Sequence, residues 1–392
     1  MKSTNNTTRK EFLPYARHWI DEQDIIEVIE VLKDNWLTTG PKIDELERKI
    51  ADYCHAKYAV AVTNGTAALH AACFAAGIKN GDEVITSPMT FAASANCVLY
   101  QGGIPVFADI DPVTYNIDPE QIERQITDRT KAIITVDYTG QPAEMDRINE
   151  IASRHQLLVI EDAAHSLGAE FKGKKVGSMA ELTTFSFHPV KHITCGEGGM
   201  VLTNNRQLYN KMKQFRTHGI IKGSASDNCG QEPWLYQQLF LGYNYRMTDF
   251  QAALGISQLK KIDMFISKRR EIAEQYNRAF STLDLVEIPA QVSGSNSSWH
   301  LYIIKLKLEK LKVGRKEVFK ALRQENLGVN VHFIPVYYHP YYQKLGYKKG
   351  LCPVAEDLYE RIITLPLFPK MTEHDVEYVI NNVTALLREN TI

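Results

Sequence analysis

The sequence has almost no net charge. Its 45 Lys and Arg residues nearly balance 46 Asp and Glu residues, which gives a formal net charge of −1 at pH 7. Such a balance gives no electrostatic reason to expect nucleic acid or an anionic membrane as a partner. Long apolar runs are missing too. The best candidate, 67–76, contains His70 and is far shorter than the ~20 residues that a membrane-spanning helix needs.

Cysteine is scarce, with six residues in 392 and no C-x-x-C pair. This spacing argues against a structural zinc site and against a disulfide framework. The polar start, MKSTNNTTRKEF, has no apolar segment of the kind found in secretory signals. These absences together predict a cytoplasmic protein with reduced thiols and no bound metal.

What the chain does contain is an alternation of short apolar runs and helix-like segments between about 57 and 204. Because the runs are almost continuously apolar and are separated by helical patterns, they predict an α/β fold with a mostly parallel sheet covered on both faces. The seven predicted strands are Tyr58–Thr63, Glu83–Ser87, Pro105–Asp109, Lys131–Asp137, Leu157–Glu161, Leu182–Phe187 and Met200–Thr203.

The remainder of the chain predicts a second, smaller unit. A long helix is expected to begin near Thr248 and to run towards Leu283, and the polar, Gly- and Ser-rich segment 221–235 is expected to be a mobile excursion. Farther on we predict strands at 300–308 and 329–334, and helices at 316–325 and 373–389. We divide the chain into a flexible N-terminal arm (1–12), a large domain (13–262) and a small C-terminal α+β domain (263–392).

Two features at the first strand ends suggest a ligand, because parallel sheets bind ligands at the carboxyl ends of their strands. Asn64-Gly65-Thr66 joins a strand to an Ala-rich helix. Free amides at that helix start would hold a phosphate, although a tight turn with Thr66 as the helix cap is the simpler explanation of this segment alone. Phe91 follows the next strand, where it would either stack on a planar ring or pack in the core.

A carboxylate and a lysine follow two later strands. Asp162 ends an apolar run, where its charge is costly unless it caps a helix or pairs with a cation such as a protonated heteroaromatic nitrogen. Lys191, in TFSFHPVKHITCGEGGM, would be a nucleophilic amine if buried, or an ordinary surface lysine if exposed. The order of phosphate seat, aromatic ring, Asp162, Ser186 and Lys191 matches what pyridoxal 5′-phosphate requires.

Five motifs in this order resemble the DegT/DnrJ/EryC1/StrS family of nucleotide-sugar aminotransferases over about 12–387. They are NGTAAL, TFAAS, EDAAHS, SFHPVKHITCGEGGM and GYNYRMTDFQAALG. The resemblance implies the fold type I (aspartate aminotransferase-like) architecture of pyridoxal-phosphate enzymes and a homodimer with active sites at its interface. Some relatives carry histidine at the position of Lys191 and catalyse a dehydration, so the lysine here favours transamination.

The resemblance also implies roles for individual residues. Lys191 matches the lysine that binds the cofactor covalently, and Asp162 matches the acid paired with the pyridine nitrogen. The other implied cofactor contacts are His165 near the 3′-oxygen, Phe91 on the ring, Thr66, Ala67 and Ser186 at the phosphate, and Asn244 donated to the phosphate by the neighbouring subunit. Candidates for sugar binding are Thr38, His188, Arg246, His332 and Tyr337. Packing explains His188, Tyr341 and Tyr342 equally well.

Three local segments look most like the family's C4 aminotransferases of pseudaminic acid biosynthesis: SFH-x-x-K-x-IT, SSWHLYIIKL and VHFIPVYYHPYYQKLGY. Those enzymes transfer the amino group of L-glutamate to UDP-2-acetamido-2,6-dideoxy-β-L-arabino-hex-4-ulose. The alternatives are a relative that acts on another keto sugar, such as UDP-4-keto-6-deoxy-D-GlcNAc, a dTDP-keto-sugar or a 3-keto sugar, and a catalytically silent relative. Joint retention of Lys191, Asp162 and Ser186 argues against the silent relative.

Overall fold

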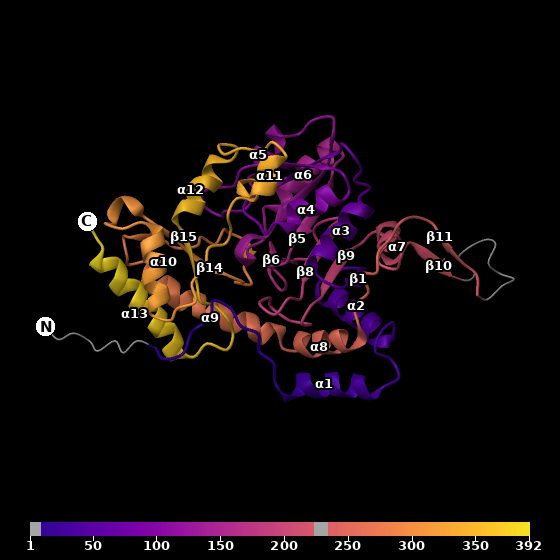
Figure 1. Ribbon diagram of the computed structural model, residues 1–392, viewed down its shortest axis with the longest axis horizontal. Helices are drawn as coiled ribbons and strands as arrows, with labels where there is room; N and C mark the ends of the chain where they lie inside the picture. The colour runs from indigo at the N-terminus through magenta and orange to yellow at the C-terminus, as the bar shows by residue number, and fades with distance from the viewer. Residues whose placement is uncertain (1–8, 223–233) are drawn as a thin grey trace.

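The centre of the protein is a seven-stranded sheet, seen in the computed structural model, which describes residues 9–222 and 234–392 (Figure 1). Its strands are β1 (Tyr58–Val62), β2 (Glu83–Thr86), β3 (Ile104–Phe107), β4 (Thr130–Val136), β5 (Leu158–Asp162), β8 (Leu182–Ser186) and β9 (Gly199–Thr203), in the order β1-β9-β8-β5-β4-β2-β3. Only β9 pairs antiparallel with its neighbours; the other pairs are parallel. The predicted strands and fold class are confirmed.

Helices cover both faces of this sheet. One face packs against α3 (Gly65–Ala75), α4 (Ala93–Tyr100) and α7 (Arg206–Phe215). The other face packs against α2 (Pro41–Tyr53) and α8 (Asp249–Leu259) at one end, and against α5 (Pro119–Arg124) and α6 (Met145–His155) at the other. In β1, Val60 packs on the first face and Ala59 and Ala61 on the second. Because successive side chains alternate between faces, a doubly covered strand must be apolar throughout.

The predicted long helix from Thr248 towards Leu283 is wrong, because the structure divides it. Thr248 does cap α8, with a capping box to Gln251, but α8 ends at Leu259 and α9 (Ile262–Phe280) begins at Ile262. No proline or glycine marks the break. Instead, Lys261 lies at the junction and places its Nζ 2.6 Å from Asp24 Oδ2 of α1 (Glu22–Lys33), a tertiary contact that the local pattern does not reveal.

The C-terminal unit is built on a three-stranded sheet of β12 (Val286–Glu287), β14 (Tyr302–Leu306) and β15 (Ile362–Leu365). It packs with α9, α10 (Arg315–Gln324) and α13 (Glu373–Glu389), so the strand predicted at 300–308 and both predicted helices are confirmed. The strand predicted at 329–334 is wrong. Only Asn330 makes a bridge there, to Thr364, while the apolar residues on either side pack into two different cores.

The boundary near residue 262 stays a prediction. Ile262 and Ile266 of α9 belong to the core beneath the large sheet, whereas Tyr276 and Phe280 belong to the C-terminal core. The hairpin of β10 (Ile220–Lys222) and β11 (Tyr236–Gln238) projects from the body, away from α13 (Figure 1). Residues 1–8 of the predicted arm and 223–233 of the predicted excursion lie outside the described residues.

Five cysteines within the described residues are buried and free, and Cys229 lies outside them. In residues 9–222 and 234–392, no helix is long and apolar enough to cross a membrane. The same part of the chain contains no group of three His, Cys, Asp or Glu residues arranged to hold a metal ion.

A buried ion pair between Arg216 and Glu47 ties α7 to α2 and provides a test of this packing. Their side chains are 10% and 7% exposed, and Arg216 Nη1 also donates to the Ala61 carbonyl of β1 at 2.6 Å. Arg216→Met leaves the Glu47 charge buried, so the free energy of unfolding measured in urea should fall by roughly 3–5 kcal/mol. The matched control is Lys213→Met, since Lys213 is a more exposed partner of Glu47 and should cost under about 1 kcal/mol. Equal losses in both variants would contradict the account.

Candidate active site

The loop between β1 and α3 presents free amides at the edge of the sheet. Asn64 caps α3, because its Oδ1 accepts from the Ala67 amide at 2.8 Å. The alternative in which Thr66 caps the helix is therefore wrong. The Gly65 and Thr66 amides lie in the first turn of α3, where an amide has no carbonyl of the same helix to bond. They can therefore donate to an anion.

Ser186, at the end of β8, lies against the same helix start. A Cβ added to Gly65 would lie 2.9 Å from Ser186 Cβ. A Cβ added to Gly199 would lie 2.3 Å from the Asn64 carbonyl oxygen. Only glycine permits these approaches, so the two glycines bring Ser186 and the first turn of α3 together as one cradle.

Asp162 is buried at the end of β5, with 6% of its surface exposed. Its carboxylate accepts from Ser94 Oγ at 2.5 Å and from the Ala164 amide at 3.2 Å. Turns rather than a helix follow it, so helix capping does not explain its position. Burial raises the pKa of Asp162, while the Ser94 hydrogen bond, the Ala164 amide and the charge of Lys191 oppose that rise.

Lys191 lies in the loop between β8 and β9, where its amide donates to the His188 carbonyl at 2.9 Å. Its side chain is partly buried. Burial lowers the pKa of the Lys191 amine to about 8; the charge of Asp162 raises it and that of Arg269 lowers it further. A lysine held in this way is not an ordinary solvated one, because roughly a tenth of its amine is unprotonated at pH 7, far more than in a free lysine side chain.

Aromatic and imidazole rings form the wall beside these groups. His165 is 6% exposed, with its ring centroid 4.3 Å from that of His300 and 5.9 Å from that of Phe333. Burial is the largest cause that lowers the pKa of His165 well below its usual value, so the ring is neutral at pH 7. Within the described part of the chain, Nδ1 of both His165 and His300 has no hydrogen-bond partner. A buried polar atom of this kind is expected to meet a ligand or water.

Phe91 stands at the open side of the wall. Its side chain is 64% exposed and its ring centroid lies 6.5 Å from that of Phe333, so the core-packing alternative does not hold. An exposed aromatic face, a buried carboxylate, an amine of lowered pKa, a neutral imidazole and a cradle of free amides now lie at one edge of the sheet. This donor set fits a phosphorylated pyridine aldehyde, as pyridoxal phosphate is.

The predicted sugar-binding residues differ in how exposed they are. Thr38 and His188 are exposed and Arg246 is half-buried. Asn244, predicted to reach the other subunit, is exposed and forms a bridge with Thr217. Since His188 is exposed, it is not a packed strand-end histidine. These four positions are open to a ligand or a second chain.

His332 and Tyr337 are held by the protein itself. His332 is 8% exposed, and its Nδ1 lies 2.9 Å from Thr364 Oγ1. Tyr337 has no exposed surface, and its hydroxyl donates to Glu356 at 2.7 Å. The structure does not bring Tyr337 to the site, since its only polar atom is already engaged. Tyr342 packs similarly, with its hydroxyl on Asn96, whereas Tyr341 is exposed.

Three residues of the site were not identified from the sequence: Ser94, His300 and Arg269. Ser94 and His300 stand inside motifs already quoted, TFAAS and SSWHLYIIKL. Their roles depend on which way each side chain points across two chain segments, and periodicity does not give that. Arg269 looks like an ordinary helical cation in the sequence, yet it is 1% exposed.

The fold and this edge of the sheet define a fold type I, pyridoxal-phosphate-dependent aminotransferase. Residues 18–384 match the sequence model of the DegT/DnrJ/EryC1/StrS aminotransferase family. The chain belongs to that family.

Two relatives match it over nearly their whole length. The uncharacterized protein MJ1066 of Methanocaldococcus jannaschii is 47% identical over 97% of this chain and 99% of its own. The spore coat polysaccharide biosynthesis protein SpsC of Bacillus subtilis is 42% identical over 97% and 98%.

Solved structures agree with this placement. PseC of Helicobacter pylori, an aminotransferase involved in the biosynthesis of pseudoaminic acid, superposes with a TM-score of 0.90 at 32% identity, covering 97% of this chain and 100% of that one. The putative sugar aminotransferase Spr1654 of Streptococcus pneumoniae, in its PMP and PLP forms, gives TM-scores of 0.91 and 0.90 at 30% identity, covering 96% and 99%. The protein is thus a sugar aminotransferase that uses pyridoxal phosphate.

The lowered pKa of Lys191 predicts a specific pH dependence. In cofactor-free protein, the acylation rate of Lys191 should rise with pH through a midpoint of about 8, whereas a free lysine side chain titrates near ~10.4. Asp162→Asn removes the charge that raises this pKa, so its midpoint should fall below that of the wild type. Competitive labelling followed by peptide mass spectrometry measures both midpoints. A higher midpoint in Asp162→Asn would show that the two groups are not coupled as described.

Proposed function

We propose that the protein transfers the amino group of L-glutamate to C4 of UDP-2-acetamido-2,6-dideoxy-β-L-arabino-hex-4-ulose, giving UDP-4-amino-4,6-dideoxy-N-acetyl-β-L-altrosamine. The observation that carries the transamination is the placement of Lys191, with its lowered pKa, at the same sheet edge as buried Asp162. Support for the sugar comes from the likeness to PseC over its full length and from the three motif segments. We further propose a cytoplasmic homodimer in which Asn244 faces the partner's cofactor phosphate.

Each group of the site has a part in this proposal. Pyridoxal phosphate, when bound, supplies the electron sink that stabilises a carbanion next to nitrogen. Asp162 would keep the pyridine nitrogen protonated, which is what makes that sink effective. The remaining residues would hold and orient the cofactor: Thr66, Ala67 and Ser186 at the phosphate, Phe91 on the ring face, and His165 at the 3′-oxygen.

Lys191 would move the proton in both half-reactions. As a free amine it would take a proton from Cα of glutamate; the amino group would stay with the cofactor, and water would supply the keto oxygen of the 2-oxoglutarate that leaves. In the second half-reaction it transfers a proton to C4 of the sugar as the amine arrives there. A pKa of about 8 suits both duties, because the group must be unprotonated in one step and protonated in the other. His188, three residues earlier and exposed, would contact the sugar.

A second candidate is an aminotransferase of the same family that acts on another keto sugar nucleotide. The chain is more identical to SpsC, at 42%, than to PseC, at 32%, and SpsC is named for spore coat polysaccharide biosynthesis. The cofactor residues do not separate the two candidates, since both reactions need the same ones. Only the sugar assay separates them.

Asp162→Asn tests the chemistry. Loss of one partner of a buried ion pair costs roughly 3–5 kcal/mol, which corresponds to a turnover that is slower by roughly two to four powers of ten, with the fold retained. The matched control is Glu161→Gln. Glu161 is also buried, burial raises the pKa of its carboxyl well above its usual value, and it accepts from Thr183 Oγ1 rather than from Ser94, so an amide there should preserve turnover. Near-normal turnover in Asp162→Asn would refute the role of Asp162.

The sugar is tested by a glutamate-dependent assay with two UDP-4-keto sugars, the L-arabino and the D-xylo forms. We expect amination of the L-arabino form, detected as the amino sugar nucleotide by mass spectrometry together with 2-oxoglutarate. The reaction without glutamate is the control. Amination of the D-xylo form alone would replace this proposal with the second candidate.

A further inference from the structure

The turn at the start of α4 places two buried hydroxyls next to the Asp162 carboxylate. Ser94 has no exposed surface, and Thr90 is 3% exposed. Ser94 Oγ lies 2.5 Å from Asp162 Oδ2, and Thr90 Oγ1 lies 2.7 Å from Ser94 Oγ. In the part of the chain that the structure describes, the Thr90 hydroxyl has no hydrogen-bond partner other than Ser94. The three groups therefore form a row that begins at Thr90 and ends on Asp162.

Helix capping does not explain these two hydroxyls. The N-cap residue of α4 is Ala92, which has no capping side chain. Within residues 9–222 and 234–392, neither Thr90 Oγ1 nor Ser94 Oγ accepts a hydrogen bond from an amide of α4. Besides Asp162 and Thr90, Ser94 Oγ reaches only the Phe91 carbonyl, at 3.3 Å. The hydroxyls therefore serve the carboxylate and each other rather than the helix.

The direction of the hydrogen bonds in this row depends on the charge of Asp162. A hydroxyl donates one hydrogen, and an ionised carboxylate only accepts. With Asp162 ionised, Thr90 donates to Ser94 and Ser94 donates to Asp162, so both short contacts are hydrogen bonds. With Asp162 protonated and donating to Ser94, the Ser94 hydrogen must turn to Thr90, whose own hydrogen then has no acceptor, or to the more distant Phe91 carbonyl. The row therefore favours the ionised form.

Thr90 adds to the effect that Ser94 has on the carboxylate. Burial raises the pKa of Asp162, and the Ser94 hydrogen bond is the strongest influence that opposes this rise. A hydroxyl that accepts a hydrogen bond becomes a better donor, because the bonds of a chain polarise one another. Donation from Thr90 thus strengthens the bond from Ser94 to Asp162.

We propose that Thr90 is a positioning residue for the reaction: through Ser94 it directs one hydrogen onto the Asp162 carboxylate and favours the charged form of that group. The inference rests on the proposed function, since it concerns the role of Asp162 at the pyridine nitrogen of the cofactor. Phe91, which is 64% exposed, lies in the same turn between the two hydroxyls. One turn of the chain thus supplies both the aromatic face and the support for the buried carboxylate.

The first test compares Thr90→Val with Thr86→Val in the cofactor-loaded enzyme. Both variants replace a buried threonine with a residue of the same shape, but Thr86 Oγ1 has no hydrogen-bond partner in the described part of the chain. The half-reaction with L-glutamate, which needs no sugar, should be roughly 3- to 10-fold slower in Thr90→Val, because one net hydrogen bond is lost. Thr86→Val should keep the wild-type rate, and Thr90→Ser, which retains the hydroxyl, should recover most of the loss. Equal rates in the two valine variants would overturn the proposal.

A double variant separates this role from simple packing. If Thr90 acts only through Ser94, Thr90→Val should not slow the Ser94→Ala enzyme any further. Losses that multiply in the double variant would mean that Thr90 acts independently of Ser94, and the proposal would be wrong.

Nitrogen NMR gives a measurement that does not depend on turnover. In enzyme loaded with pyridoxal phosphate that is isotopically labelled at its ring nitrogen, the chemical shift reports the protonated fraction of that nitrogen. At one pH, this fraction should be lower in Thr90→Val than in Thr86→Val, and identical shifts would overturn the proposal. Asp162→Asn separates the inference from the proposed function. A shift that changes in Asp162→Asn but not in Thr90→Val refutes the role of Thr90 alone, whereas a wild-type shift in Asp162→Asn refutes the role of Asp162 itself.

Discussion

The site depends on opposite charges that are kept partly out of water at neighbouring strand ends. Burial by itself drives Asp162 towards its protonated form and Lys191 towards its free amine, and the charge of each opposes that drive in the other. Ser94 adds a hydrogen bond that favours the Asp162 carboxylate. The result is a carboxyl group whose rise in pKa is opposed by its neighbours and an amine with a pKa of about 8. Both properties are what a proton-transfer site around a pyridine ring requires.

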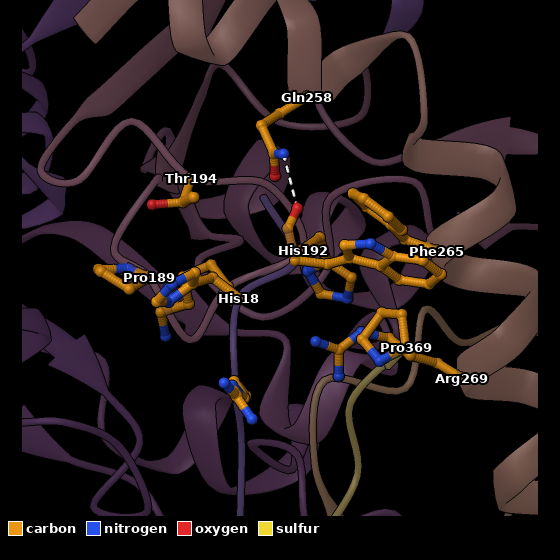
Figure 2. A pocket seen from close by; sticks show the side chains of 11 residues that line it. His18, Pro189, His192, Thr194, Gln258, Phe265, Arg269 and Pro369 are labelled. Carbon is orange, nitrogen blue, oxygen red and sulfur yellow. Dashed lines mark hydrogen bonds between the residues drawn. The ribbon is translucent and has the colours of Figure 1, made fainter. Parts of the chain in front are cut away.

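The rest of the fold maintains this arrangement. Parallel strands β5 and β8 pair, so Asp162 and Ser186 end at one edge of the sheet, and glycines at positions 65 and 199 let α3 and β9 approach that edge closely. The C-terminal unit closes the other side with His300 and Phe333. Arg269 of α9 donates to the His300 carbonyl just before β14 and to the Leu367 carbonyl just after β15, and it also lines a small cavity beside Lys191 (Figure 2).

Much of the fold was predictable because a doubly covered sheet requires strands that are apolar on both faces, and such strands are conspicuous in the sequence. The break between α8 and α9 was not, because it depends on the contact of Lys261 with Asp24 rather than on a proline or glycine. The alternation in 329–334 was misleading for a related reason. Val329 packs into one core and Val331 into another, so the pattern reflects a crossing between cores and not a paired strand.

The site residues likewise divide into those that the sequence predicts and those that it does not. Asp162 was predictable as chemistry because it ends β5, and Lys191 because it lies in the loop that follows β8. Ser94 and Arg269 were not, because their importance comes from a partner that is distant in sequence. Tyr337 shows the converse: its aromatic segment pointed to a pocket, yet its hydroxyl is held by Glu356 in the core.

The most direct measurement of the central claim is the visible absorption of the purified protein with and without Lys191. A cofactor held by this amine makes the wild type yellow, and Lys191→Ala should lose that absorption band while its far-ultraviolet circular dichroism stays unchanged. A Lys191→Ala protein that keeps the same band would contradict the account, because the cofactor would then be held by another group.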